Sequence, residues 1–143
     1  MTILICCWCL LLQGYCMAQD FSTYQWEIHD TTNAPFATNR MVEVYFQDNG
    51  TTWLTTTHQE LYAYDGTTWT HHPKPKDWAF RGWLHQMVMT QKGKLWLTGI
   101  VGQLVSYDPK TKQWDQVPFP EGGQPWVIRQ NKKGVMLIAT SIA

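Results

Sequence analysis

The sequence has no excess of charge of either sign. Its 143 residues carry 11 lysines and arginines against 11 aspartates and glutamates, and only 15% of the chain is charged. Binding to a phosphate backbone requires a basic surface, so this balance argues against a nucleic-acid partner. Aromatic residues reach 14%, with nine tryptophans. That content is enough to build a hydrophobic core and argues against disorder.

Cysteine is absent beyond residue 16, and the apolar run near the start of the chain is too short to cross a membrane. This run, Ile3 to Leu12, has ten residues, whereas a membrane helix needs about 20. Its length is typical of the hydrophobic region of a signal peptide. Cys16 and Ala18 supply the small residues that a signal peptidase reads. We therefore predict a signal peptide over residues 1–18, cleaved before Gln19, and an exported, periplasmic or extracytoplasmic protein.

The cysteines all lie within this leader, at Cys6, Cys7, Cys9 and Cys16. A cleaved leader offers no folded frame for a metal or redox site, and the mature chain has no thiol for a disulfide. The alternative is a lipoprotein with lipid on Cys16, although the bulky Tyr15 stands where a small residue is expected.

An internal repeat organises the rest of the chain. Three segments align when Gly50, Gly93 and Gly134 are superposed, at spacings of 43 and 41 residues. The first two copies also share Trp53 with Trp96, Leu61 with Leu104, Tyr64 with Tyr107, and Asp65 with Asp108. The third copy keeps the glycine but has Leu137 in place of the tryptophan.

Each copy consists of short β-runs separated by turn residues. In the first copy we expect strands at 41–47, 53–57, 60–64 and 68–72, with turns at 48–50 and 65–66. Four strands in a repeat of about 43 residues are typical of a β-propeller blade. The sequence therefore predicts an all-β fold, a β-propeller of four-stranded antiparallel blades at about 39–80, 84–120 and 124–143.

The propeller is expected to be incomplete within residues 19–143. Two full repeats and a partial third are present, whereas propellers need roughly four to eight blades. Residues 23–29 are expected to form a closing strand, with Trp26 in the place of Trp69 and Trp114. A closing strand would complete the last blade of the ring and remove an exposed edge. We interpret the chain as the N-terminal part of a longer protein whose further blades lie beyond it.

The repeat resembles the two-component regulator propeller family, with its pattern V-x-x-I-x-x-D-x-x-G-x-x-W-x-G-T-x-x-G-L-x-x-Y-D. The resemblance covers about Arg40 to Thr140. Matching residues in the two full copies are Asp48, Gly50, Trp53, Leu54, Thr56, Leu61, Tyr64 and Asp65, and then Gly93, Trp96, Leu97, Gly99, Leu104, Tyr107 and Asp108. The departures are Gln91 and Asn131, aligned with Asp48, and Leu137, aligned with Trp53.

This resemblance implies a periplasmic sensor region that precedes a membrane helix and a histidine kinase, in bacteria that use complex glycans. An oligosaccharide ligand and a dimer through downstream domains are expected as partners. No catalytic residues are expected in this segment, because its sequence has no compact cluster of catalytic residue types. No cofactor is expected. A propeller that only binds another protein is a further alternative.

A second resemblance is to the Asp box of sialidase-type propellers, carried by Asp48 to Trp53 (DNGTTW). A sialidase needs three converging arginines and a tyrosine nucleophile, but Arg40, Arg81 and Arg129 each precede or occupy the first strand of their own copy. The internal repeat explains why one arginine stands near the first strand of each copy. A propeller-type glycosidase or lyase remains the enzymatic alternative.

Ligand-binding residues are expected where the last strand of one blade crosses to the first strand of the next, because loops on a rigid scaffold often carry binding residues. The segment 73–86 is rich in tryptophan and arginine, and its aromatic rings and cations suit sugars and anionic groups. The residues singled out are Arg40, Trp78, Arg81, Trp83, His85 and Trp126. The alternative role of Trp78 and Trp83 is to fill gaps between blades. His71 and His72 lack a third ligand, so no metal site is expected.

Overall fold

A computed structural model describes residues 27–78, 82–99, 102–117 and 123–142. The predicted signal peptide and Trp26 lie outside these residues. All regular structure in the described part is β. The strands are β1 (Met41–Phe46), β2 (Thr52–Thr56), β3 (Leu61–Tyr64), β4 (Trp69–His72), β5 (Leu84–Met89), β6 (Leu95–Gly99), β7 (Gln103–Asp108), β8 (Gln113–Val117), β9 (Gly123–Gln130) and β10 (Met136–Ile142).

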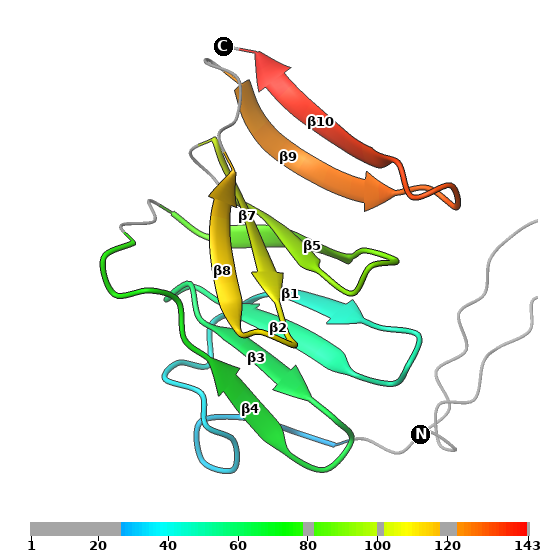
Figure 1. Cartoon of the computed structure of the whole chain (residues 1–143). Helices are drawn as coiled ribbons and strands as arrows, with labels where there is room; N and C mark the ends of the chain where they lie inside the picture. Colours follow the sequence, from blue (N-terminus) through cyan, green and yellow to red (C-terminus); the bar gives the residue numbers. More distant parts are fainter. Residues whose placement is uncertain (1–26, 79–81, 100–101, 118–122, 143) are drawn as a thin grey trace, which may run out of the picture.

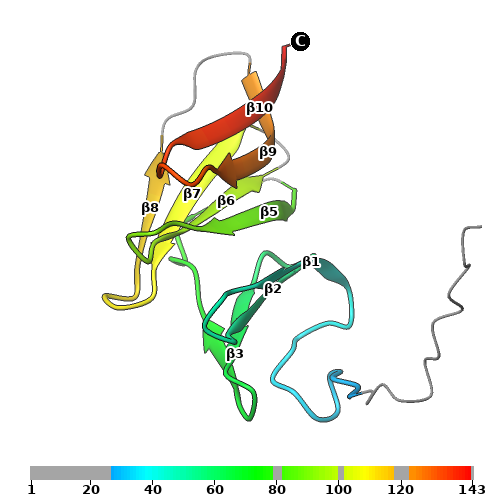
Figure 2. The ribbon, with the colours of Figure 1, turned by 90° about the vertical axis from the view of Figure 1, so that its right-hand side faces the viewer.

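These strands form three antiparallel sheets in chain order. The first sheet has the order β1-β2-β3-β4, the second has the order β5-β6-β7-β8, and the third is the hairpin β9-β10. The sheets are stacked in sequence (Figures 1 and 2), so that β5 contacts β1 on one side and β9 on the other. The predicted fold class, with four-stranded antiparallel blades, is confirmed. The four strands expected in the first copy are present, with bounds that differ by one residue or less.

The same turn joins the first two strands of every sheet. The amides of Gln47, Thr90 and Asn131 donate to the carbonyl four residues later, and the turn glycine donates back to the carbonyl of the same residue. The three glycines, Gly50, Gly93 and Gly134, have φ angles of 88°, 80° and 81°, which favour glycine. This geometry corrects one alignment: Asn131 is equivalent to Gln47 and not to Asp48, because both amides start the turn.

A hydrophobic core fills the space between the first and second sheets. Trp53 and Leu61 come from the first sheet, and six residues of the second sheet meet them. The members from the second sheet are Leu84, Met87, Leu95, Leu97, Val105 and Tyr107. Alternation along each strand places these side chains on one face. Trp53 and Tyr107, which occupy recurring positions of the repeat, thereby enter the packing between blades.

A second core joins the opposite face of the second sheet to the hairpin. Val88 and Leu104 pack there against Ile128, with Met136 and Ile138 of the hairpin half-buried beside them. The second sheet is therefore covered on both faces, as a blade inside a propeller is.

The outer face of the first sheet is covered by the segment that precedes β1. Phe36 is buried against Leu54 and Tyr62, and its ring lies 4.9 Å from the ring of Trp69 in an edge-on orientation. Residues 27–29, the described part of the expected closing strand, are not in a strand. The rest of that expected strand lies outside the described residues, so the prediction remains open.

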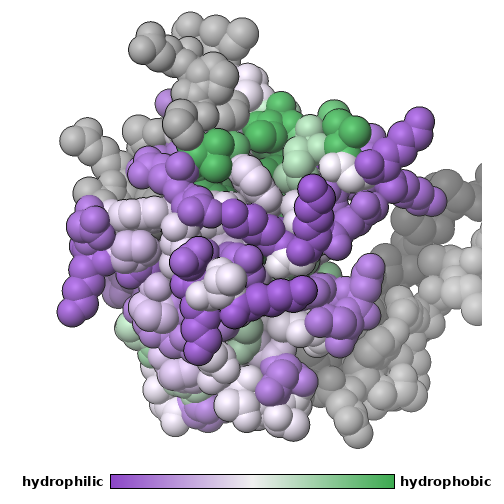
Figure 3. Space-filling model, viewed as in Figure 1, coloured by the Kyte–Doolittle hydropathy of each residue, from purple (hydrophilic) through white to green (hydrophobic). Residues whose placement is uncertain are grey.

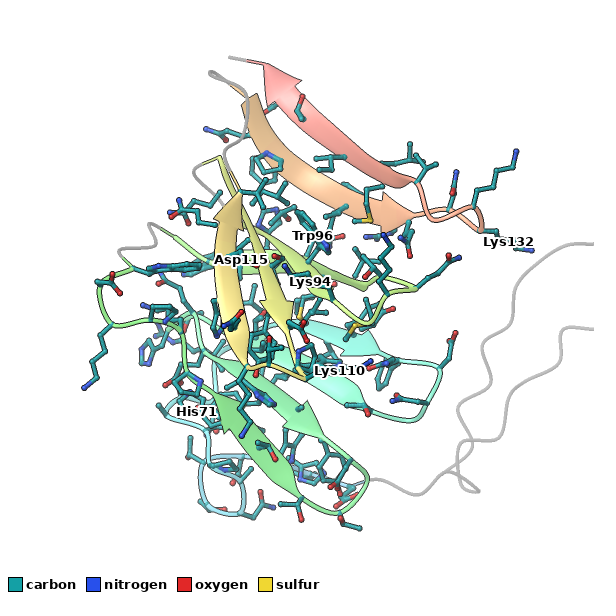
Figure 4. All side chains as sticks on the ribbon, viewed as in Figure 1. His71, Lys94, Trp96, Lys110, Asp115 and Lys132 are labelled. Carbon is teal, nitrogen blue, oxygen red and sulfur yellow. The ribbon has the colours of Figure 1, made fainter. Side chains whose placement is uncertain are left out.

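The hairpin leaves one of its faces uncovered. Val127 and Leu137 are exposed there, Leu137 at 57%. Figure 3 shows hydrophobic side chains gathered in the region of β9 and β10, above a mostly hydrophilic surface in the region of β7 and β8. In Figure 4, Lys94 and Asp115 lie close together on that hydrophilic surface, where they form a salt bridge of 2.5 Å.

Candidate functional site

The first strand of each sheet carries a β-bulge at the same position of the repeat. The pairing of β1 shifts between Met41 and Glu43, and that of β5 shifts between Leu84 and Gln86. In β9 the shift falls between the residues on either side of Trp126. The bulged residues are thus Val42, His85 and Trp126. A bulge changes the direction of a side chain and bends the strand, and here it does so where three edge strands lie side by side.

Two of the bulged residues are in contact. The rings of His85 and Trp126 lie 5.3 Å apart at an angle of 62°. The indole Nε1 of Trp126 donates to Ser141 Oγ at 2.8 Å across the hairpin, which fixes the orientation of the ring. Both ring nitrogens of His85 are buried and have no hydrogen-bond partner among the described residues. Buried polar atoms are normally paired, so His85 has unused hydrogen-bonding capacity.

Arg129 connects the hairpin to the second sheet. Its Nη1 donates to Gln86 Oε1 at 2.6 Å and to the carbonyl of Ile128 at 2.7 Å. Arg129 is exposed, and a guanidinium has five N–H donors. It therefore retains donors beyond those two bonds.

Glu43 of β1 lies near these groups. Burial raises the pKa of its carboxyl group, while the nearby Arg129 and His85 act in the opposite direction. The structure gives its carboxylate no hydrogen bond or salt bridge within the described residues. Its oxygens are therefore available as acceptors.

We call Glu43, His85, Gln86, Trp126 and Arg129 the inner-edge cluster. It combines an aromatic face, an amide, a carboxylate, an imidazole and a guanidinium, contributed by β1, β5 and β9. In a propeller the first strands of the blades surround the central channel, which is a common place for a ligand. Such a set of groups can bind a polar ligand from several sides.

The structure brings together two of the residues singled out in the sequence, His85 and Trp126. Arg40 is exposed, and its carbonyl accepts a hydrogen bond from the amide of Thr57. Trp83 is 49% exposed. Arg81 lies outside the described residues.

Trp78 lies away from the inner-edge cluster. It packs beside the core between the first two sheets, and its ring meets that of Trp114 edge-on at 6.4 Å. This packing agrees with the gap-filling role considered for it.

Sequence reasoning did not select Glu43, Gln86 or Arg129 as site residues. The repeat alignment contains the signal for two of them, because Glu43 and Gln86 both lie seven residues before their turn glycine. Arg129 gives no such signal, because its contact with Gln86 joins strands of two different sheets.

A hollow of about 450 Å³ lies elsewhere, on the outer side of the first sheet. Tyr64 and Trp69 stack along one wall, with ring centroids 4.8 Å apart, and Glu27 and His29 complete it. It adjoins the start of the described residues, where a closing strand is predicted. We therefore take the inner-edge cluster as the candidate site.

No group of three or more histidine, cysteine, aspartate or glutamate side chains within the described residues could hold a metal ion. The described part of the chain also contains no helix long and apolar enough to span a membrane.

The structure is similar to the extracellular domains of sensor proteins. It matches the extracellular domain of BT4673 from B. thetaiotaomicron, assigned as a hybrid two-component system, with a TM-score of 0.63 and 16% sequence identity over 78% of this chain. The extracellular domain of BT3049 from the same organism, with the same assignment, matches with a TM-score of 0.59 and 17% identity over 79% of the chain. The chain spans only 15% and 16% of the lengths of these two domains.

An enzyme of the same fold is also similar. Virginiamycin B lyase from Staphylococcus aureus matches with a TM-score of 0.55 and 17% identity, over 69% of this chain and 34% of the lyase. No family model and no curated protein matches the sequence. At these identities the likeness establishes the fold. The chain is thus a β-propeller segment, a fold that agrees with the two-component regulator propeller family that its repeat resembles.

Proposed function

We propose that this chain is the ligand-recognition part of an exported two-component sensor that responds to a glycan. The observation that carries the proposal is the inner-edge cluster, in which three successive blades direct polar and aromatic groups to one place. The structural likeness to sensor extracellular domains supports the same function. In this proposal residues 1–18 direct export, and the segment binds its ligand without transforming it.

The remaining parts of the sensor belong to the same proposal. Further blades after residue 143 would complete the ring, a histidine kinase would follow a membrane helix, and a dimer would form through those downstream domains. Binding of an oligosaccharide to the propeller would be transmitted to the kinase.

The proposal is tested with the full-length sensor in its host. We expect one class within a panel of plant, host and microbial oligosaccharides to raise the melting temperature of the purified extracellular region and to induce transcription of genes under the control of the sensor. Stabilisation by a protein partner, with no response to any glycan, would instead favour a protein-binding scaffold.

The enzymatic alternative has one specific observation in its favour, the likeness to the lyase. Chemical conversion of the bound glycan distinguishes an enzyme from a sensor. Incubation of the full-length protein with the glycan that binds it, followed by mass spectrometry, should return the glycan intact. A shortened or unsaturated product would establish a glycosidase or lyase.

A further inference from the structure

The indole of Trp126 offers a flat apolar surface at the inner-edge cluster. The side chain is 43% exposed, although its N–H is already bonded to Ser141 and its ring contacts His85. The ring is therefore held in place while part of it stays open to solvent. Aromatic rings fixed in this way supply contact area at low entropic cost, and the C–H face of a sugar ring is a suitable partner.

The same cluster also holds an acceptor, Glu43 on β1, and a donor, Arg129 on β9. Glu43 makes no hydrogen bond within the described residues, and Arg129 keeps donors beyond those given to Gln86 and Ile128. A hydroxyl group can donate to the first and accept from the second. A ligand rich in hydroxyl groups thus satisfies both side chains at once.

The charges of the cluster restrict the ligand further. Its one carboxylate and one guanidinium balance each other. An acidic sugar would bring a second carboxylate beside Glu43, which is already penalised by burial, and like charges in a partly buried site repel strongly. A cationic ligand would meet the same difficulty at Arg129. An uncharged ligand avoids both costs.

We propose that the inner-edge cluster binds a neutral, hydroxyl-rich sugar ring, stacked on Trp126 and hydrogen-bonded by Glu43 and Arg129. This inference rests on the proposed function and specifies its ligand class and its site. His85 and Gln86 act as positioning residues, since His85 supports the indole ring and Gln86 orients the guanidinium.

The test is isothermal titration of the complete extracellular region of the sensor. The neutral probes are the hexasaccharides of cellulose, xylan, mannan and starch, and the acidic probes are hexasaccharides of polygalacturonate and heparin. We expect at least one neutral probe to bind. Trp126→Ala removes the stacking surface, and the nearly isosteric Glu43→Gln removes the charged acceptor. Each should weaken that binding by about tenfold or more.

Matched controls separate the site from general effects on the fold. Phe46→Ala removes an exposed aromatic ring from β1, and Asp115→Asn removes an exposed carboxylate from β8. Both controls should leave the affinity unchanged, and circular dichroism of all four variants should match that of the wild type. Glu43→Gln preserves shape, so the test survives if Trp126→Ala fails to fold.

Each outcome has a defined meaning. Neutral binding that is insensitive to Trp126→Ala and Glu43→Gln would overturn this site but leave glycan sensing intact. Binding of acidic probes alone would overturn the neutral ligand class. Binding of none of the six probes would overturn this inference, while the response of the sensor to other glycans would decide the proposed function separately.

Discussion

Two threonines at equivalent positions of the first two blades differ in their hydrogen bonding. Thr55 is buried in β2, and its hydroxyl donates to the carbonyl of Leu84 in the next blade at 2.8 Å. Thr98 is equally buried in β6, but its hydroxyl has no partner within the described residues. The Thr55 hydroxyl links two blades, whereas the Thr98 hydroxyl loses its contact with water and gains no hydrogen bond within the described residues.

We therefore expect Thr55→Val to lower the free energy of unfolding by about 1–2 kcal/mol, because the Leu84 carbonyl loses a buried donor. The same change at Thr98 should be neutral or slightly stabilising. Urea denaturation of the two variants measures the difference. Equal losses at the two positions would show that the Thr55 hydrogen bond contributes nothing specific.

His72 makes the contact between the first two blades dependent on pH. Burial, aided by the nearby positive charges of His71 and Lys112, lowers the pKa of His72 to about 4. Its Nδ1 lies 2.8 Å from the hydroxyl of Tyr107, and its ring packs against Trp53. The unfolded chain takes up a proton near pH 6.5, but the folded chain does so only near pH 4. The stability that depends on neutral His72 is thus fully present above pH 6.5 and is lost as the pH falls toward 4.

Replacement by asparagine removes this titration. The wild type should lose stability between about pH 6.5 and pH 4 more steeply than His72→Asn does, in thermal unfolding followed at several pH values. The exposed His58 provides the control, since His58→Asn should keep the slope of the wild type. A His72→Asn slope equal to that of the wild type would show that other groups cause the acid sensitivity.

The segment before β1 acts as a cover for the first sheet, although it contains no strand or helix. Phe36 is buried at the centre of that cover, while Phe46, at the end of β1, is 75% exposed. Phe36→Ala should destabilise the protein by about 3–5 kcal/mol, which is typical of a buried phenylalanine. Phe46→Ala should cost less than about 0.5 kcal/mol. Chemical denaturation of both variants tests this, and similar losses would mean that the segment does not cover the sheet.

The sequence predicted the elements well where their signals are local. The turn of each blade needs glycine at a positive φ, and alternating apolar residues indicate the strands on either side of it. Gly50 and Trp53 were therefore sufficient to place β1 and β2. The role of Phe36 was not predicted, because its segment has no periodicity and its partners belong to three later strands.

The candidate site was predicted only in part for a related reason. His85 and Trp126 stood out as an unusual histidine and tryptophan beside a crossing segment. Glu43 and Arg129 are ordinary charged residues in sequence, about 86 positions apart, and only the stacking of three blades brings them together. A repeat alignment shows equivalent positions, but it does not show which side chains turn toward a shared edge.

At the scale of the whole molecule, the stack of sheets ends in an open face. Val127 and Leu137 lie on the side of the hairpin away from the second sheet, and Ile128 and Ile138 lie on the covered side. No other strand of the described residues pairs with the outer edge of β10. An apolar face beside a free strand edge promotes association between chains.

A polypeptide of residues 19–143 alone, without the predicted signal peptide, should therefore self-associate, as measured by light scattering after gel filtration. The double variant Val127→Thr and Leu137→Thr should shift the population toward the monomer, because threonine keeps the β propensity while lowering the apolar area. Lys132, which projects from the turn between β9 and β10 (Figure 4), supplies the control, since Lys132→Thr leaves the apolar face unchanged and should leave the association unchanged. A wild-type polypeptide that is monomeric at high concentration would show that this face is too small to drive association. In a longer chain the same face would be the surface on which the next sheet packs. The apolar side chains that make the short polypeptide associate would then be buried inside a complete ring.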